Sequence, residues 1–484
     1  MHTKPGPTPQ ELRRALHEAA DWVASYLETV GDRPVLAQVS PGDTAASLPH
    51  SAPPRAEPLE RILADIDQVI MPGITHWNHP AFFAYFGISG SGPGIIGELL
   101  SAALNVNAML WRTSPAATEL EQRVLAWVAE MLGLPRAWFG EITDTASAST
   151  LYALAAAREA AGVDIREQGM AGRTDLPPLA IYTSTQAHSS VDKAAIALGI
   201  GRRWTRHIDT DAEFRMRPEV LEQAIKVDLA AGVTPLAVVA TVGTTSSTSI
   251  DPVEIIADLC ERYDLWLHVD AAYGGAAALL PSHRHVLRGC DRADSFVTNP
   301  HKWLLTPIDC SLLYTRRPDD LKRAFSLVAE YLRTSESDVI NLMDYGLSLG
   351  RRFRALKLWM VIRAYGQEGL AQIINDHIKA AQWLAMQIDQ ESGWERLAPV
   401  PFSTVCFRHA PAGVTDLETH NTKILDTVNA SGAAFLSHTK LNGEYALRVA
   451  IGNQATTQEH VAQMWNQLKQ IAGTMGRNAS GKLP

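Results

Sequence analysis

Cysteine is scarce in this sequence, and long apolar runs are absent from it. Four cysteines occur among 484 residues, none in a CxxC spacing, which argues against a disulfide framework and against a thiolate zinc site. We interpret Cys260, Cys290, Cys310 and Cys406 as reduced thiols in the core or near the surface. No window reaches the roughly 18 uncharged apolar residues that a membrane span requires, and the first residues lack the apolar core of a secretory signal. We therefore expect a cytoplasmic protein without a membrane segment.

Basic runs are missing as well. The formal net charge is −9, so we expect no nucleic-acid partner, and solubility is the simplest explanation of the acidity. The apolar content of 46% is that of a globular protein. The length exceeds what a single hydrophobic core usually holds, which predicts about two or three packed units.

The N-terminal part of the chain has helical patterns but too few apolar residues for a core of its own. Residues 9–30 and 57–71 show helical periodicity, separated by a stretch over residues 40–58 that contains Pro, Gly and Ser and cannot be one regular element. We expect residues 1–100 to form a helical arm that packs on a larger body, such as a second subunit.

From residue 117 onward, helical and strand patterns alternate. Residues 119–132 have helical spacing and stop at Gly133, and Asp251-Pro252 are expected to cap a helix that ends at Tyr263. Short apolar runs predict buried strands over residues 179–183, 236–241, 265–269, 295–298 and 311–314. This alternation predicts an α/β fold with a mainly parallel sheet flanked by helices. We assign residues 101–366 to this large domain and residues 367–484, with a final strand over 445–451, to a small C-terminal α+β domain.

The first chemical motif follows a predicted strand and contains Lys302. A single lysine is usually a solvated surface charge. Lys302, however, lies in Asn-Pro-His-Lys-Trp (299–303), among aromatic and apolar neighbours that lower a lysine's pKa. A neutral amine is what a Schiff base with an aldehyde requires. Because ligand crevices lie at the carboxyl ends of parallel strands, Lys302 is a candidate for covalent attachment of a cofactor.

The second motif ends the apolar run over residues 265–269 with the carboxylate of Asp270. Such an aspartate often only caps the next turn. If a pyridine ring lies there, Asp270 can form a charge-assisted hydrogen bond with the ring nitrogen and keep it protonated. Ala272, two residues further, is small enough to let a flat ring lie against the backbone.

Two weaker motifs complete the set. His188 follows the strand over residues 179–183, where its imidazole could stack on a ring, although an isolated histidine is more often structural. Thr145, Ala146 and Ser147 lead into a helix predicted over residues 151–161. Small hydroxyl residues are ordinary N-caps, and a helix N-terminus is also a phosphate-binding site, because its backbone N–H groups are free.

In order and spacing, these motifs resemble those of the group II pyridoxal-5′-phosphate (PLP) decarboxylases, most closely the aromatic L-amino acid decarboxylases. The resemblance covers nearly the whole chain and includes DAAYGG (270–275), NPHKW (299–303) and LGRRFRALKLW (349–359). It implies PLP as the cofactor and the type I fold of PLP-dependent transferases (aspartate aminotransferase-like). It also implies a homodimer with its sites at the interface.

The resemblance further implies a role for each motif residue. Lys302 would hold PLP as an imine, Asp270 would bind the ring nitrogen, and His188 would stack on the ring. The remaining cofactor contacts would be Ala272 on the other ring face, Thr245 beside the ring hydroxyl, and Thr145, Ala146, Ser147, Asn299 and His301 at the phosphate.

For the substrate, the resemblance implies an aromatic amino acid bound by Trp77, His79, Tyr85, Phe86, Gly87 and Gly350. An aromatic cluster such as residues 77–86 is usually core, but it also fits an indole or phenol ring. Gly87 departs from the proline that is common in the family's aromatic decarboxylases, and the small Gly350 accompanies tolerance of indole in plant relatives. A metal site at His76 and His79 is disfavoured because no third ligand lies nearby.

Position 342 departs from the family in a way that bears on the product. The family's proton donor is a loop tyrosine nine residues before the first arginine of GRRFR, and here that residue is Leu342. Family members without this tyrosine use O₂ and release an aldehyde, ammonia and peroxide.

Three interpretations therefore remain open. The first is decarboxylation to an amine, with His188, Tyr345 or water as the proton donor. The second is oxidative deamination to an aromatic aldehyde, and the third is another PLP reaction or a PLP-binding homologue without turnover. The identity of the preferred aromatic amino acid is not determined by these motifs.

Overall fold

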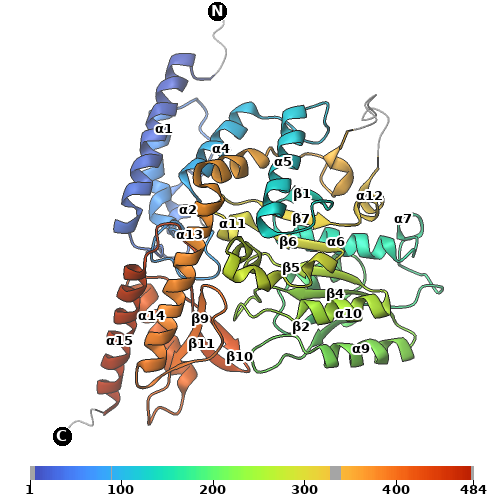
Figure 1. Ribbon diagram of the computed structural model, residues 1–484. Helices are drawn as coiled ribbons and strands as arrows, with labels where there is room; N and C mark the ends of the chain where they lie inside the picture. The colour runs from blue at the N-terminus through green and yellow to red at the C-terminus, as the bar shows by residue number, and fades with distance from the viewer. Residues whose placement is uncertain (1–5, 89, 328–338, 481–484) are drawn as a thin grey trace, which may run out of the picture.

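The computed structural model describes residues 6–88, 90–327 and 339–480, and it contains two sheets (Figure 1). The larger sheet has seven strands in the order β1-β7-β6-β5-β4-β2-β3. The five strands from β6 to β3 in this order run parallel, so the predicted mainly parallel sheet is confirmed. Strand β7 pairs antiparallel with both β6 and β1 and therefore runs opposite to the other six strands. The strands are β1 (Phe139–Thr143), β2 (Leu179–Ser184), β3 (Thr205–Ile208), β4 (Thr234–Thr241), β5 (Trp266–Asp270), β6 (Ser295–Thr298) and β7 (Ser311–Thr315).

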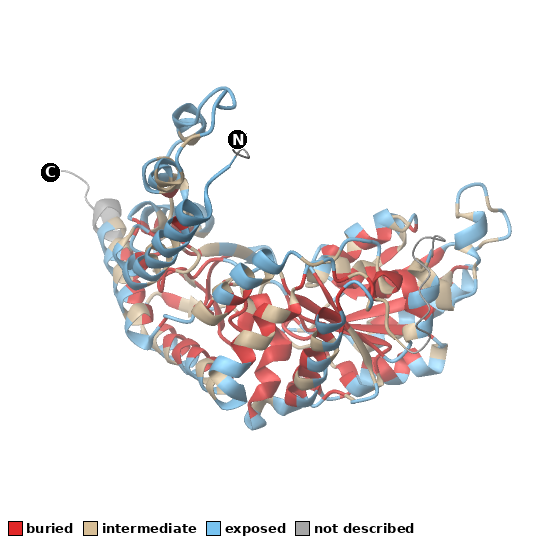
Figure 2. Cartoon of the chain, turned by 90° about the horizontal axis from the view of Figure 1, so that it is seen from above, coloured by how far each residue is buried: buried red, intermediate tan, exposed pale blue. Residues whose placement is uncertain are grey.

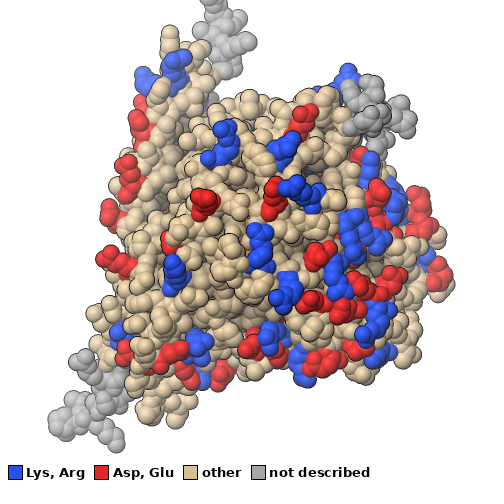
Figure 3. Space-filling model, in the orientation of Figure 1, with Lys and Arg blue, Asp and Glu red and all other residues tan. Residues whose placement is uncertain are grey.

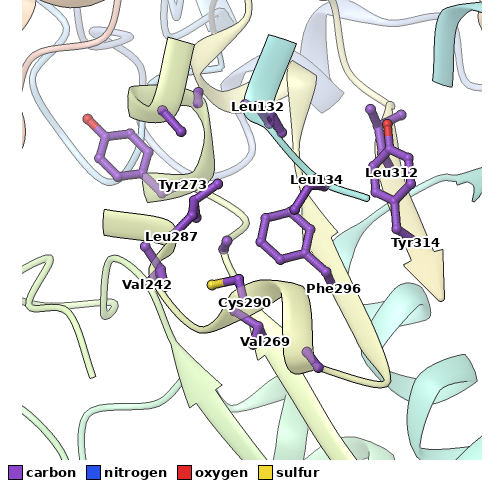
Figure 4. Close-up of a cluster of buried hydrophobic side chains, with 14 of the residues drawn as sticks. Leu132, Leu134, Val242, Val269, Tyr273, Leu287, Cys290, Phe296, Leu312 and Tyr314 are labelled. Carbon is purple, nitrogen blue, oxygen red and sulfur yellow. The ribbon is translucent and has the colours of Figure 1, made fainter. Parts of the chain in front are cut away.

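Helices flank this sheet, and four of its strands are buried along their whole length. Every residue of β2, β5, β6 and β7 is buried, as a sheet covered on both faces requires. Figure 4 shows one of the apolar clusters, in which Phe296 of β6 lies near Leu134 and Cys290. The helices are α5 (Pro115–Leu132), α6 (Ala146–Ala160), α7 (Ile165–Gln168), α8 (Ser190–Ala197), α9 (Pro218–Ala230), α10 (Val253–Tyr263), α11 (Pro300–Trp303) and α12 (Pro318–Phe325).

Two helix ends test the sequence patterns. Helix α5 ends at Gly133, which adopts a left-handed conformation (φ 77°), as the glycine predicts. The predicted cap at Asp251 is wrong, because Pro252 is the N-cap of α10. The Asp251 carboxylate instead accepts hydrogen bonds from the backbone N–H groups of Met216 (2.7 Å) and Thr241 (2.8 Å), and so joins two neighbouring segments.

The N-terminal segment contains α1 (Pro9–Thr29), α2 (Asp43–Ser47), α3 (Leu59–Asp65) and α4 (Gly92–Leu104). Of these helices, α1 has a capping box between Thr8 and Glu11, yet Ala15 is its one buried residue. Most of this segment is exposed (Figure 2). The N-terminal arm that packs on a second subunit and the domain boundaries at residues 100 and 366 stay predictions.

The C-terminal part begins with the long helix α13 (Ala355–Gln390), which is kinked at Gly366 (φ 65°). It continues with β8 (Trp394–Arg396), β9 (Thr404–His409), α14 (Leu417–Ala430), β10 (Ser437–Leu441), β11 (Glu444–Ala450) and α15 (Gln458–Ser480). The four strands form an antiparallel sheet. All four cysteines are free and buried, and among the described residues no helix is long and apolar enough to span a bilayer.

Candidate active site

One cavity, of 420 Å³, collects the predicted cofactor residues at the carboxyl ends of β2, β4, β5 and β6. All ten of them line it: Thr145, Ala146, Ser147, His188, Thr245, Asp270, Ala272, Asn299, His301 and Lys302. These residues come from separate strand ends and helix starts, so only the folded sheet brings them together. The position agrees with the rule that open α/β sheets bind ligands at this edge.

Lys302 lies in α11, a single helical turn near the centre of the molecule (Figure 1). Burial lowers the pKa of its amine because the apolar surroundings disfavour the ammonium form. Arg448 acts in the same direction, whereas Asp270 opposes it. The amine is therefore closer to the neutral form that attacks a carbonyl carbon than a surface lysine would be.

Asp270 is the last residue of β5, and its Oδ1 accepts a hydrogen bond from the backbone N–H of Ala272 at 3.1 Å. The other carboxylate oxygen accepts no hydrogen bond from the described residues and can accept one from a ligand in the cavity. His188 also lines the cavity, just before α8, and its Nδ1 accepts a hydrogen bond from the backbone N–H of Ser190 at 3.2 Å. Burial lowers the pKa of His188, so the neutral ring with its proton on Nε2 is favoured.

The cavity can also hold a phosphate. Thr145 is the N-cap of α6 but makes no side-chain cap, so the first N–H groups of the helix remain available at the cavity wall. Burial lowers the pKa of His301 to about 4, and its Nδ1 accepts from Cys310 N–H at 2.9 Å, which leaves the ring proton on Nε2.

The residues present fit PLP. Among the described residues, the buried hydroxyl of Thr241 on the cavity wall has no hydrogen-bond partner, as expected for an oxygen that awaits a polar ligand. The donor set matches the cofactor group by group, with an amine for the aldehyde, a carboxylate for the ring nitrogen and a free helix N-terminus for the phosphate.

The predicted substrate residues divide into two groups. Trp77, Tyr85 and Phe86 line the cavity, with the rings of Trp77 and Tyr85 stacked at 5.9 Å. His79 does not line the cavity. Its Nδ1 accepts a hydrogen bond from the backbone N–H of Ala81 at 2.9 Å, and its Nε2 donates one to the backbone carbonyl of Gly31 at 3.2 Å. Neither Gly87 nor the exposed Gly350 is among the lining residues. Among the described residues, no group of three potential metal ligands occurs.

The two loop residues predicted for catalysis also lie away from the cavity of their own chain. Leu342 is buried at the start of the turn η9 (Leu342–Tyr345). Tyr345 stacks on Phe139 with ring centroids 4.2 Å apart. Neither lines the cavity, and their roles stay predictions.

Arg448, in β11, lines the cavity and was missed by sequence reasoning. It is 4% exposed, and it donates hydrogen bonds to the backbone carbonyls of Tyr85, Thr245 and Ser246. Its guanidinium lies 4.5 Å from the centroid of the Phe86 ring, and Lys302 Nζ lies 5.0 Å from the same centroid. A single charge within the apolar run over residues 445–451 was the signal that could have revealed it.

A second group of missed residues forms the wall that is contributed by the C-terminal sheet. Ser437, His438 and Thr439 of β10 line the cavity, and the Thr439 hydroxyl lies 2.7 Å from that of Ser246. This bond joins the loop after β4 to the C-terminal part of the chain. The alternating pattern of β10 carries no chemical signature, so the sequence alone offered no signal for it.

Comparisons with known proteins agree with this geometry. Residues 41–410 match the model of the pyridoxal-dependent decarboxylase conserved domain. The chain is 41% identical to phenylacetaldehyde synthase of Arabidopsis thaliana, covering 96% of each chain, and 41% identical to tyrosine decarboxylase 3 of Petroselinum crispum, covering 96% of this chain and 93% of the relative. The crystal structure of Oryza sativa TDC with PLP and tryptamine superposes with a TM-score of 0.93 at 36% identity, covering 98% of this chain and 100% of that one.

Proposed function

The chain belongs to the pyridoxal-dependent decarboxylase family, and we propose that it removes the α-carboxylate of an aromatic L-amino acid with PLP as its cofactor. One observation carries the proposal. The buried amine of Lys302, the carboxylate of Asp270 and the imidazole of His188 share a cavity with an uncapped helix N-terminus. When bound, PLP supplies a conjugated ring that accepts the electron pair left behind as CO₂ departs.

The chain's own residues would bind and orient the cofactor and the substrate. Lys302 would hold the cofactor aldehyde, Asp270 would keep the ring nitrogen protonated, and His188 would lie against the ring. Arg448 retains N–H donors beyond the three that serve the backbone, and its buried positive charge suits the carboxylate of an amino acid. The apolar wall of Trp77, Tyr85 and Phe86 suits an aromatic side chain.

The test measures both cofactor binding and the preference for a class of substrate. Purified protein should be yellow from the Lys302-bound cofactor, and Lys302→Ala should lose this absorption together with turnover. Lys193→Ala, which removes an exposed lysine of α8, is the control and should change neither. Tryptophan, tyrosine or phenylalanine should react better than glutamate by more than about 100-fold, because an acidic side chain would be unpaired against the aromatic wall. A colourless but active protein, or a preference for glutamate, would contradict the proposal.

A second function has a specific observation in its favour. Leucine at position 342 has no proton to donate, and one of the relatives is a phenylacetaldehyde synthase. In this reaction, the amino acid, O₂ and water yield an aldehyde, CO₂, ammonia and hydrogen peroxide. Two electrons pass from the α-carbon to O₂, and water supplies the aldehyde oxygen. Quantifying amine against aldehyde from one aromatic substrate distinguishes the two functions.

We also propose that the protein is a homodimer. Four apolar side chains of α4 (Ile96, Leu99, Leu100 and Leu104) are between 45% and 59% exposed. A contiguous apolar face of this kind marks an interaction surface. The turn with Leu342 and Tyr345 does not line the cavity of its own chain. In a dimer with its sites at the interface, this turn would be able to reach the cavity of the second copy.

A further inference from the structure

The turn that carries Lys302 is held from behind by a chain of buried hydrogen bonds. Trp303 is 1% exposed, and its Nε1 donates to Nδ1 of His377 in α13 at 3.0 Å. His377 is 2% exposed, and its Nε2 donates to the backbone carbonyl of Asn453 at 2.9 Å. Because Nδ1 accepts and Nε2 donates, this chain requires one tautomer of the neutral imidazole. Burial lowers the pKa of His377 to about 4, which agrees with the neutral form.

The segment after β11 that contains Asn453 also contacts two other parts of the site. The ring of Trp303 stacks on Tyr273 at 4.5 Å with the planes 6° apart, and the Tyr273 hydroxyl is hydrogen-bonded to Ser403. Ser403 in turn donates to the carbonyl of Ile451 at 2.6 Å. The Asn453 side chain donates to the carbonyl of Trp77, a residue of the cavity wall, at 3.0 Å. Residues 451–453 therefore join the lysine turn, the ring stack behind it and the substrate wall.

We propose that His377 is a positioning residue for Lys302, which acts through Trp303 to fix the direction of the lysine amine. The inference rests on the proposed function, in which Lys302 is the reactive amine. Helix α11 has only four residues, so its own hydrogen bonds hold it weakly, and the anchor at Trp303 supplies an external constraint one residue from the lysine. Misplacement of a reactive group by about 1 Å can reduce a rate about 100-fold, which makes such an anchor consequential.

The test uses the full-length enzyme with PLP, four variants and one control variant. His377→Leu removes both hydrogen bonds, Trp303→Phe removes the donor but keeps a ring to stack on Tyr273, and the double variant combines them. His377→Gln retains one acceptor and one donor. His409→Leu is the matched control, because His409 is also a buried histidine but is hydrogen-bonded to His420 rather than to the turn that carries Lys302.

We expect His377→Leu and Trp303→Phe each to lower kcat at saturating PLP by about tenfold with little change in KM, because orientation rather than substrate binding is lost. The absorption band of the Lys302-bound cofactor should change in both variants. The double variant should be no slower than the slower single variant, since both break one chain. His377→Gln should recover most of the rate, and His409→Leu should lose thermal stability but not kcat.

A rate and absorption spectrum of folded His377→Leu and Trp303→Phe that match the wild type would overturn the proposal, as would effects that add in the double variant. If His377→Leu does not fold, Trp303→Phe and His377→Gln provide the same comparison. A wild type that binds no PLP would instead refute the proposed function, so the two failures are distinguishable.

Discussion

At position 342 the chain has a side chain without an exchangeable proton. General acid catalysis typically accelerates a step by about 100- to 10,000-fold, so its loss can turn a minor oxidative route into the main one. We expect Leu342→Tyr to raise the share of amine in the product and to lower the O₂ consumed per CO₂ released. The measurement quantifies amine, aldehyde, peroxide and CO₂ from one aromatic substrate.

Two variants accompany this experiment. Leu342→Phe adds ring volume at the same buried position without a hydroxyl, so it separates proton donation from packing. Tyr345→Phe tests whether the neighbouring tyrosine is the donor, in which case this variant loses amine and Leu342→Tyr is nearly silent. A wild type that makes amine stoichiometrically without O₂ uptake, and is unchanged by Leu342→Tyr, would show that Leu342 does not divert the reaction.

Glu141 of β1 is a second residue whose chemistry is set by burial. Burial raises its pKa to about 8, although Arg351 opposes the shift, and within the described chain its Oε1 has no hydrogen-bond partner. The folded state therefore keeps a proton that the unfolded state releases between about pH 4.5 and 8, so this group makes stability fall as pH rises through that window. We expect Glu141→Gln to gain stability relative to the wild type, by a few kcal/mol (about 1.4 per pKa unit), across the same window. Urea denaturation from pH 5 to 9 checks this, and parallel curves would contradict it.

At the scale of elements, the crossing of α4 over α13 depends on Gly97. A Cβ at this position would meet the Cα of Lys357 at 2.5 Å, and because that atom belongs to the backbone it cannot move aside easily. We expect Gly97→Ala to destabilise the protein by about 1–3 kcal/mol through overpacking.

Gly473→Ala is the matched control for this crossing. Gly473 lies in α15 with nothing near its missing Cβ, so alanine there should be neutral or stabilising by up to about 1 kcal/mol. The denaturation midpoint should fall for Gly97→Ala and should stay the same or rise for Gly473→Ala. Equal stability of Gly97→Ala and the wild type would mean that the two helices can separate without cost.

At the scale of the molecule, the exposed face of α4 predicts self-association. Figure 3 shows charged side chains gathered over α9 and α10 and fewer charged side chains over the upper centre of the view. We expect the double change Leu99→Glu and Leu100→Glu to shift the protein from dimer to monomer and to reduce activity, because buried unpaired carboxylates oppose association. Ile255→Glu, at a 51% exposed position of α10, should leave the dimer intact. Sedimentation or light scattering measures the result, and a monomeric wild type would refute the dimer.

Local patterns were sufficient to predict much of this protein. The apolar runs that became β2, β4, β5, β6 and β7 are detectable because strands buried on both faces must be continuously apolar. Of the ten cofactor residues, seven belong to motifs at strand ends and a helix start (Thr145, Ala146, Ser147, His188, Asp270, Ala272 and Lys302). The family resemblance implied the other three, which are Thr245, Asn299 and His301. Five strands were missed: β1, β3, β8, β9 and β10. Of these, β3, β8 and β10 each have only one or two buried residues, which is too few for a distinct pattern.

Tertiary structure alone decided the rest of the site. Arg448, Thr439 and His377 lie far from the motifs in sequence, and only the packing of the C-terminal part against the large sheet brings the first two to the cavity and His377 to Trp303. The same packing keeps the predicted residue His79 out of the cavity wall, and its ring nitrogens are instead hydrogen-bonded to backbone groups. A motif can specify the chemistry of one side chain, whereas proximity and burial depend on contacts between segments that no local pattern encodes.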